Sequence, residues 1–232
     1  IPQFIDTFDP DDSRLSDNFL MGQILYPDGS PVKCEIGNEA GHLMDVQNVV
    51  PGLAWAEEIH GYKLAKYEYV AGMAPWAMSN DVFPFRYTDV LMMKAECLLR
   101  TGKADEAAEI VTRVRQRAFT NAPEKAKVTG EQLKEGSCYD YGLRETAYLD
   151  RIKNPRTTHE GGADIEYGRF FDELGWEFNQ ELHRRQDMIR FGVWTTKSWL
   201  SHSATHDINK NLYPIPRREL DKNAKLKQNP GY

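Results

Sequence analysis

The chain has 232 residues, of which 41% are hydrophobic and 28% charged, a composition typical of a globular protein with a substantial core. Its formal net charge is -6, and basic residues never follow one another in runs longer than two, which argues against a nucleic-acid partner. Its apolar stretches are far shorter than the roughly 20 residues of a membrane-spanning helix. Three widely spaced cysteines fit neither a zinc site nor a disulfide framework.

The first 80 residues predict a loop-rich region. Residues 1–19 are rich in Asp and Pro, which favours a loop followed by a short helix. Two strand-like runs, 23–26 and 32–36, flank the turn-forming sequence PDGSP and indicate a small hairpin. We expect a further strand over residues 62–70. Glycines and prolines interrupt the remaining segment, which contains several aromatic side chains.

From Phe85 onward the spacing of apolar residues becomes that of two helices. Gly102 separates them and is expected to adopt the left-handed conformation that ends a helix. Cys97, inside the first helix, is expected to be a small core residue. Small residues in the second helix predict a close helical hairpin. The predicted apolar faces are Tyr87, Leu91, Ala95 and Leu98 in the first helix, and Ala107, Val111, Val114 and Ala118 in the second.

The remaining sequence predicts further helices separated by loops. Residues 121–142 indicate a polar loop with one short helical turn, and residues 143–152 a helix that ends before Pro155. A long helix is expected over residues 167–191, with its other face charged and solvated. Two prolines predict an extended tail over 212–216, followed by one helical turn. The apolar stripe of the long helix is Phe171, Leu174, Phe178, Leu182 and Ile189.

Four separated motifs resemble one known family. They are RYTDVLMMKAECL at 86–98, the segment 105–118, ELHRRQDMIRFG at 181–192, and the ending YPIPRREL with NPGY at 213–232. Together they resemble the SusD/RagB family of nutrient-binding outer-membrane lipoproteins, and DSRL at 12–15 extends the resemblance over nearly the whole chain. The sequence departs from the family pattern at Leu182, where the family has Gly, and at Arg185, where it has an aromatic residue.

The resemblance implies a mainly α, SusD-like fold: a tetratricopeptide-type helical hairpin with irregular loops and a few short β-strands. We expect residues 1–232 to form the carboxy-terminal part of a SusD/RagB-like domain. Within it, residues 1–80 are the expected loop-rich ligand-binding region, 84–192 the helical core and 193–232 an extended tail. The resemblance also implies an amino-terminal half, with a lipid anchor, that is absent from this chain.

The same resemblance implies a binding protein that is not an enzyme and needs no cofactor. It would bind an oligo- or polysaccharide at the bacterial cell surface, held at the outer membrane, and deliver it to a TonB-dependent SusC-like transporter. Relatives that capture other nutrients, such as peptides, leave the ligand class open. The alternatives are a carbohydrate-active hydrolase, which needs two convergent carboxyl groups, and a helical-repeat scaffold for protein interactions.

Aromatic residues in the irregular region are the predicted ligand site, because sugars stack their C–H faces on aromatic rings. Loop aromatics are more often exposed than those in periodic segments, which favours Trp55, Tyr62 and Trp76. The alternative interpretation is that these rings fill the core.

Two groups of polar residues have structural interpretations. Glu173, Glu177 and Glu181 recur every four residues, which indicates a solvated or salt-bridged helix edge rather than a catalytic pair. The family resemblance implies that Glu181, His183, Arg184 and Asp187 form a structural cluster that pairs with the helical hairpin. No metal site is predicted, because His202 and His206 lack a third ligand and the Asp-rich start lacks the spacing of a calcium loop.

Overall fold

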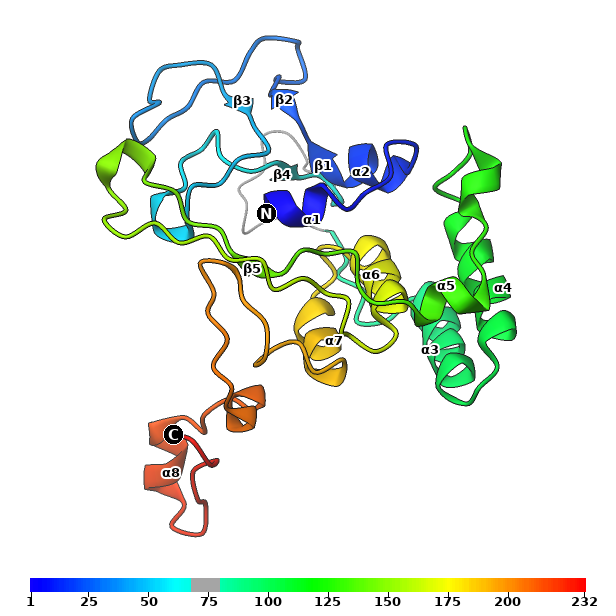
Figure 1. The fold of residues 1–232 in the computed structure, drawn as a ribbon. Coiled ribbons are helices and arrows are strands. Elements are labelled where there is room, and N and C mark those ends of the chain that lie inside the picture. Colours follow the sequence, from blue (N-terminus) through cyan, green and yellow to red (C-terminus); the bar gives the residue numbers. More distant parts are fainter. Residues whose placement is uncertain (68–79) are drawn as a thin grey trace.

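A computed structural model describes residues 1–67 and 80–232, in which helices form the core and every strand is two residues long. The mainly α architecture predicted from the sequence is confirmed. Figure 1 shows the helices between residues 87 and 190 gathered together, with the loops of the first 67 residues on one side and the carboxy-terminal tail projecting away. Among the described residues, no helix is both long enough and apolar enough to span a membrane.

A helical hairpin of α3 (Tyr87–Arg100) and α4 (Ala104–Arg115) forms one half of the core. Gly102 ends α3 with a φ of 82°, and the Lys103 N–H donates to the Leu98 carbonyl at 2.9 Å, which confirms the predicted left-handed cap. The predicted face of α4 is also confirmed, because Ala107, Val111, Val114 and Ala118 are all buried.

The predicted face of α3 is partly wrong. Tyr87 is 67% exposed, and Cys97 is exposed rather than part of the core. The buried face is instead Asp89, Met92, Ala95, Glu96 and Leu99. This helix is apolar on both sides, so hydrophobic periodicity could not decide its orientation. The choice depends on Asp89 and Glu96, which turn inward to contact His183 and Arg190 from a later part of the chain.

Short helical segments connect the hairpin to the second half of the core. The 3₁₀ turn Pro123–Ala126 and the helix α5 (Gly130–Lys134) lie where one helical turn was predicted. Thr129 starts α5 by accepting a hydrogen bond from the Gln132 N–H at 3.2 Å. Helix α5 packs against both α4 and α6 (Gly168–Glu177) and thereby joins the two halves.

The helix predicted over residues 143–152 is wrong. The chain instead forms β5 (Gly142–Leu143), which pairs in parallel with β6 (Trp199–Leu200), and then a 3₁₀ turn, Tyr148–Asp150. Gly142 permits the close pairing, because an added Cβ would lie 2.0 Å from the Thr158 carbonyl oxygen. Partners distant in sequence therefore determine this segment, and a local pattern does not reveal them.

The long helix predicted over residues 167–191 is divided into α6 and α7 (Arg184–Arg190). Gln180 and Leu182 between them have positive φ angles of 67° and 64°, which a helix cannot contain. Leu182, predicted to lie on the buried stripe, is 89% exposed. The break turns Glu181 toward Arg86 and His183 toward Asp89, at the start of α3, and these polar contacts replace the helical continuation.

The first part of the chain folds as loops over α6. Helices α1 (Pro2–Ile5) and α2 (Ser13–Asn18) are followed by β1 (Phe19–Leu20), which pairs with β4 (Lys63–Leu64). Strand β2 (Gly22–Gln23) pairs with β3 (Asp45–Val46). The predicted turn at 27–31 does reverse the chain, with the Val32 N–H donating to the Ile24 carbonyl at 2.9 Å. Within the described residues, the strand predicted over 62–70 is limited to β4.

Residues 212–222 of the carboxy-terminal tail have the predicted form. After the 3₁₀ turn Ile208–Asn211 the chain is extended, and α8 (Arg217–Lys222) is the helical turn expected after the prolines. The Tyr232 hydroxyl donates to the Leu212 carbonyl at 2.7 Å and closes the tail into a loop.

Candidate functional site

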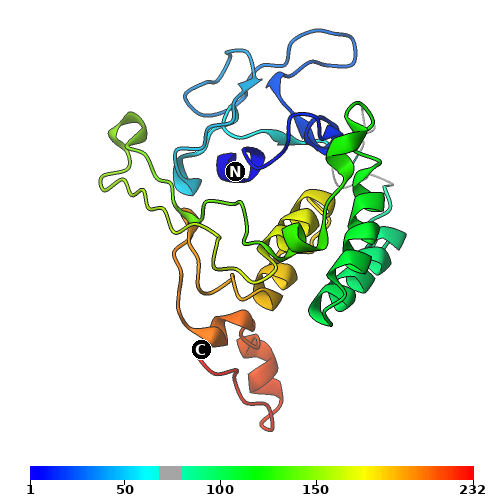
Figure 2. The same ribbon diagram turned by 45° about the vertical axis from the view of Figure 1, so that its right-hand side comes forward.

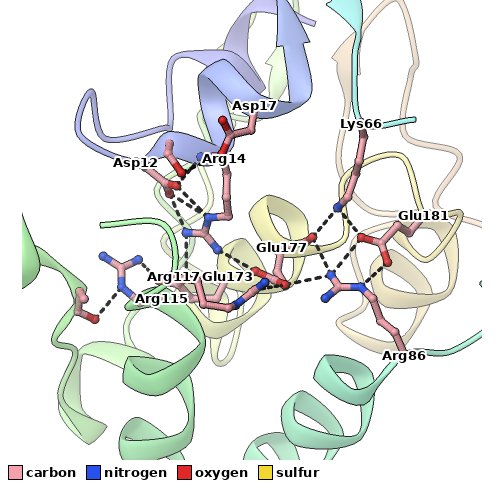
Figure 3. A network of polar contacts seen from close by, with 12 residues as sticks. Asp12, Arg14, Asp17, Lys66, Arg86, Arg115, Arg117, Glu173, Glu177 and Glu181 are labelled. Atoms are coloured by element: carbon pink, nitrogen blue, oxygen red, sulfur yellow. Dashed lines mark hydrogen bonds and ion pairs between the residues drawn. The ribbon is translucent and has the colours of Figure 1, made fainter. Parts of the chain in front are cut away.

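Three glutamates that the sequence places one turn apart lie inside the protein and form ion pairs with cations from four other segments (Figure 3). They are Glu173 and Glu177 in α6 and Glu181 just after it. We call these three residues and their cations the buried ion-pair network. Its contacts include Arg115 Nη1 to Glu173 Oε1 at 2.6 Å, Arg117 Nη2 to Glu177 Oε1 at 2.5 Å, Arg86 Nη2 to Glu177 Oε1 at 2.9 Å, and Arg86 Nε to Glu181 Oε2 at 2.6 Å.

The network joins the outer segments of the chain to α6. Arg14 of α2 reaches Glu177 with its Nη1 at 3.4 Å, and Lys66 also pairs with Glu181. Burial alone would raise the pKa of Glu177, but the charges of neighbouring arginines hold that pKa below its usual value. The carboxylate is therefore ionised and matched by cations. The predicted salt bridges are confirmed, whereas the prediction of a solvated face is wrong.

Two members of the predicted polar cluster, Glu181 and His183, contact the start of the helical hairpin, whereas Asp187 pairs with Arg190 of its own helix. His183 Nε2 lies 3.3 Å from Asp89 Oδ1, and Arg190 Nε lies 2.9 Å from Glu96 Oε1. Arg184 differs, because its guanidinium lies over the Phe171 ring at 3.7 Å. A cavity of about 530 Å³ opens between α3 and α7, and its carboxylates are engaged in these same ion pairs. The cavity therefore belongs to the packing of the two helices.

One set of side chains has metal-ligand spacing without the right electrostatics. Ligand atoms of Asp89, Glu181 and His183 all lie within 4.8 Å of one another. However, Glu181 is already paired with Arg86 and Lys66. These positive charges oppose a second cation, so the site does not fit a metal ion.

A different cluster lies at the surface, where the loop 52–60 meets the turn 146–152. Trp55, in the 3₁₀ turn Leu53–Trp55, is 37% exposed. The Arg151 guanidinium lies over its ring at 5.6 Å and over the Tyr148 ring at 5.9 Å. The His60 ring meets the Tyr148 ring edge to face at 5.1 Å. In Figures 1 and 2 the cyan loop and the yellow-green turn lie side by side in both views.

Buried polar groups hold this surface cluster in place. The Glu57 side chain is only 8% exposed, and its Oε1 lies 3.4 Å from Arg151 Nη1. Asn38 also donates a hydrogen bond to Glu57. The Glu57 N–H donates to His60 Nδ1 at 2.9 Å, which fixes the ring that supports Tyr148. We call Trp55, Glu57, His60, Tyr148 and Arg151 the aromatic platform.

The sequence-predicted site residues have three different outcomes. Trp55 lies on the aromatic platform, so its role in binding stays a prediction with an exposed ring to support it. Tyr62 is half-buried and packs against the apolar cluster of Ile5, Phe8, Phe19 and Trp176. It is therefore not brought together with Trp55, and its core interpretation is the better one. Trp76 lies outside the described residues.

Sequence reasoning missed the other half of the platform. Tyr148 and Arg151 lie in the segment 143–152, for which the sequence predicts a helix. In a helix, an aromatic residue and an arginine do not by themselves indicate a binding site. The signal available was the polar, proline-interrupted sequence after them, which is typical of a loop.

Comparison with known proteins identifies the family. The model of the SusD family matches residues 3–232, which is nearly the whole chain. The chain belongs to the SusD family. The buried ion-pair network and the aromatic platform are thus features of a SusD-family chain, and the resemblance seen in the sequence motifs is confirmed.

Two curated relatives match only over a small share of their own length. SusD-like protein P25 of Formosa agariphila is 28% identical over 155 residues, covering 64% of this chain and 23% of that protein. The starch-binding protein SusD of Bacteroides thetaiotaomicron is 25% identical over 160 residues, covering 66% of this chain and 22% of that protein. The chain therefore spans less than a third of the length of these relatives.

Solved structures show the same fold. NanU of B. fragilis has a TM-score of 0.51 at 19% identity, over 99% of this chain and 38% of that one. A SusD-like protein of Bacteroides fragilis has a TM-score of 0.52 at 19% identity, over 95% of this chain and 39% of that one. At this identity the similarity establishes the fold alone.

Proposed function

We propose that this chain belongs to a protein that binds a glycan without altering it chemically, and that the aromatic platform is part of the binding surface. The observation that carries the proposal is the exposed Trp55 ring, fixed beside Tyr148 by the Arg151 guanidinium. Membership of a family that includes a starch-binding protein supports it. Ring faces stack on sugar C–H groups, while guanidinium N–H groups donate to hydroxyls.

The arrangement of carboxylates favours binding over hydrolysis. Glycoside hydrolysis needs two carboxyl groups facing each other across the scissile bond. Glu177 and Glu181, by contrast, are buried and matched by arginine and lysine. Glu57, the carboxylate of the platform, is also paired, with Arg151. These groups hold the fold and the platform, and a non-catalytic role agrees with membership of the SusD family.

The proposed role of the whole protein extends beyond this chain. We infer capture of glycan at the outer-membrane surface and delivery to a SusC-like TonB-dependent transporter, with a lipid anchor in the amino-terminal half. Family membership supports this inference.

Affinity gel electrophoresis of the intact protein against a panel of polysaccharides tests the proposal. We expect at least one polysaccharide to retard the protein, and Trp55→Ala to abolish most of this retardation. Trp76→Ala tests the remaining predicted ring in the same gels. Release of reducing sugar would instead support a hydrolase. Failure of every polysaccharide to retard the protein, together with capture of a peptide, would favour the protein-interaction scaffold.

A further inference from the structure

We infer that the aromatic platform selects neutral sugars over sugars that carry a carboxylate or sulfate. This inference rests on the proposed glycan-binding function and concerns its specificity. The cation on the platform, Arg151, is 35% exposed, which would ordinarily invite an anionic ligand. Its guanidinium is, however, already required by a buried carboxylate inside the protein.

That carboxylate is Glu57. Its side chain is 8% exposed, and in the described ranges of the chain Arg151 is the only cationic side chain that forms an ion pair with it. Asn38 supplies a neutral hydrogen bond but no charge. This ion pair therefore matches one negative charge with one positive charge, unlike the buried ion-pair network, where Glu177 meets three arginines.

An anionic sugar would upset this balance in two ways. If Arg151 turned toward the ligand, Glu57 would be left as a buried charge without its cation, which is strongly unfavourable. If Arg151 stayed in place, the ligand anion would lie close to Glu57 and be repelled through a medium of low dielectric constant. Either way, part of the attraction to Arg151 is lost.

A neutral sugar avoids both problems. A guanidinium has five N–H donors in a fixed plane, so Arg151 can donate to a sugar hydroxyl while it keeps its contact with Glu57. The Trp55 and Tyr148 rings, which both contact the Arg151 guanidinium, supply faces for stacking. The platform therefore suits pyranose rings with free hydroxyls and no charged substituent.

Strain in the turn that carries Tyr148 and Arg151 supports a functional role for their placement. Leu149 and Asp150, between them, have positive φ angles of 46° and 56°. Two consecutive residues other than glycine in this conformation are energetically unfavourable, and such strain concentrates at functional sites. Hydrogen bonds hold the turn closed, including the Arg151 N–H to the Tyr148 carbonyl at 2.9 Å.

The test compares a neutral oligosaccharide that binds the protein with a counterpart of the same linkage in which one hydroxymethyl group is oxidised to a carboxylate. Isothermal titration of the intact wild-type protein should show the neutral form binding about 10-fold more tightly, or better, at low ionic strength. Raising the salt concentration should narrow this ratio, because screening weakens the repulsion. Equal binding, or tighter binding of the anionic form, overturns the inference.

The variant Glu57→Gln provides a second test, because Arg151 then has no Glu57 carboxylate to pair with and its charge is available to a ligand. We expect this variant to gain affinity for the anionic sugar, bringing the two affinities within about 3-fold of each other. Arg151→Gln should weaken binding of the neutral sugar, whereas the matched control Arg156→Gln should not, since its guanidinium pairs with Glu145. An unchanged ratio in Glu57→Gln with a native circular-dichroism spectrum contradicts the inference.

The two proposals fail in different ways. If no oligosaccharide binds the wild-type protein, the glycan-binding function itself is wrong. If neutral and anionic sugars bind equally well, glycan binding stands and only the selectivity is wrong. The wild-type comparison decides this even if Glu57→Gln does not fold.

Discussion

The protein uses paired arginine and glutamate side chains in two regions, with different surroundings and different consequences. In the buried ion-pair network, Glu177 is 3% exposed and contacts Arg14, Arg86 and Arg117. On the aromatic platform, Glu57 contacts Arg151, whose side chain remains 35% exposed between two rings. The first arrangement joins four segments of the fold, whereas the second places a cation and two aromatic faces at the surface.

This difference separates stability from recognition. Removing one partner of a buried pair leaves an uncompensated charge, and the cost should be larger around Glu177, which meets three arginines, than around Glu57, whose single cationic partner is 35% exposed. The buried network should therefore determine the free energy of unfolding, and the platform should determine ligand affinity.

The largest effect is expected from Glu177→Gln. Without the carboxylate, Arg117 loses the anion it pairs with and Arg14 and Arg86 each lose one of their anionic partners, so the free energy of unfolding should fall by about 3–5 kcal/mol in urea titrations. The control is Glu131→Gln, which removes an exposed partner of Lys134 and should change stability by less than about 0.5 kcal/mol. Similar stabilities for the two variants would show that the network does not hold the fold together.

Trp55→Ala should change ligand affinity rather than stability. Losing one stacking ring is expected to weaken glycan binding by about 10-fold or more, with a change in melting temperature of only a few degrees. Tyr213→Ala is the matched control, because Tyr213 is also an exposed ring beneath an arginine, Arg185, at 4.0 Å. Equal losses of affinity in both variants would contradict the proposal that the aromatic platform binds the glycan.

Acidification should weaken the platform through His60. Burial lowers the pKa of His60, and the charge of Lys63 adds to the lowering, although the charge of Glu57 acts in the opposite direction. The Nδ1 atom of His60 accepts a hydrogen bond from the Glu57 N–H. The neutral ring is thus the folded form, and its stabilising contribution is complete above the unfolded pKa near 6.5 and lost as pH falls through the lower folded value. Glycan affinity should fall about 3-fold between roughly pH 7.5 and 5. Titrations of His60→Gln, which cannot protonate in this range, should show a flatter profile; an identical slope would contradict this explanation.

The smallest effect is expected from Leu149→Gly. Glycine relieves the positive φ of 46°, so the free energy of unfolding should rise by about 0.5 kcal/mol. Greater freedom of the turn should weaken glycan binding slightly. Leu212→Gly, at an exposed leucine with a φ of -91°, should instead destabilise the protein. A loss of stability in Leu149→Gly would show that the turn is not strained.

The helical hairpin was predictable because its signals are local. Gly102 ends α3, and the small apolar face of α4 follows the helical period. The terminal prolines likewise determine an extended tail without reference to other segments. These features, together with the order of the motifs, were sufficient to identify the family and the mainly α fold.

The errors arose where distant partners decide the structure. The chain breaks after α6 because Glu181 pairs with Arg86, which is 95 residues earlier in the sequence. Residues 142–143 form a strand because they pair with Trp199–Leu200. The local sequence around residues 142–143 does not show this pairing. For the same reason Trp55 could be proposed from its loop, but Tyr148 and Arg151 could not.

Hydrogen–deuterium exchange of the intact protein, with and without a bound neutral oligosaccharide, tests most directly whether the aromatic platform binds the glycan. It reports on Trp55 and Tyr148 segments together and requires no substitution. We predict slower exchange in residues 52–60 and 146–152, with α3 and α4 unchanged. Protection confined to the tail or to the helical hairpin, with neither of those two segments affected, would contradict the assignment of the aromatic platform as the glycan-binding surface.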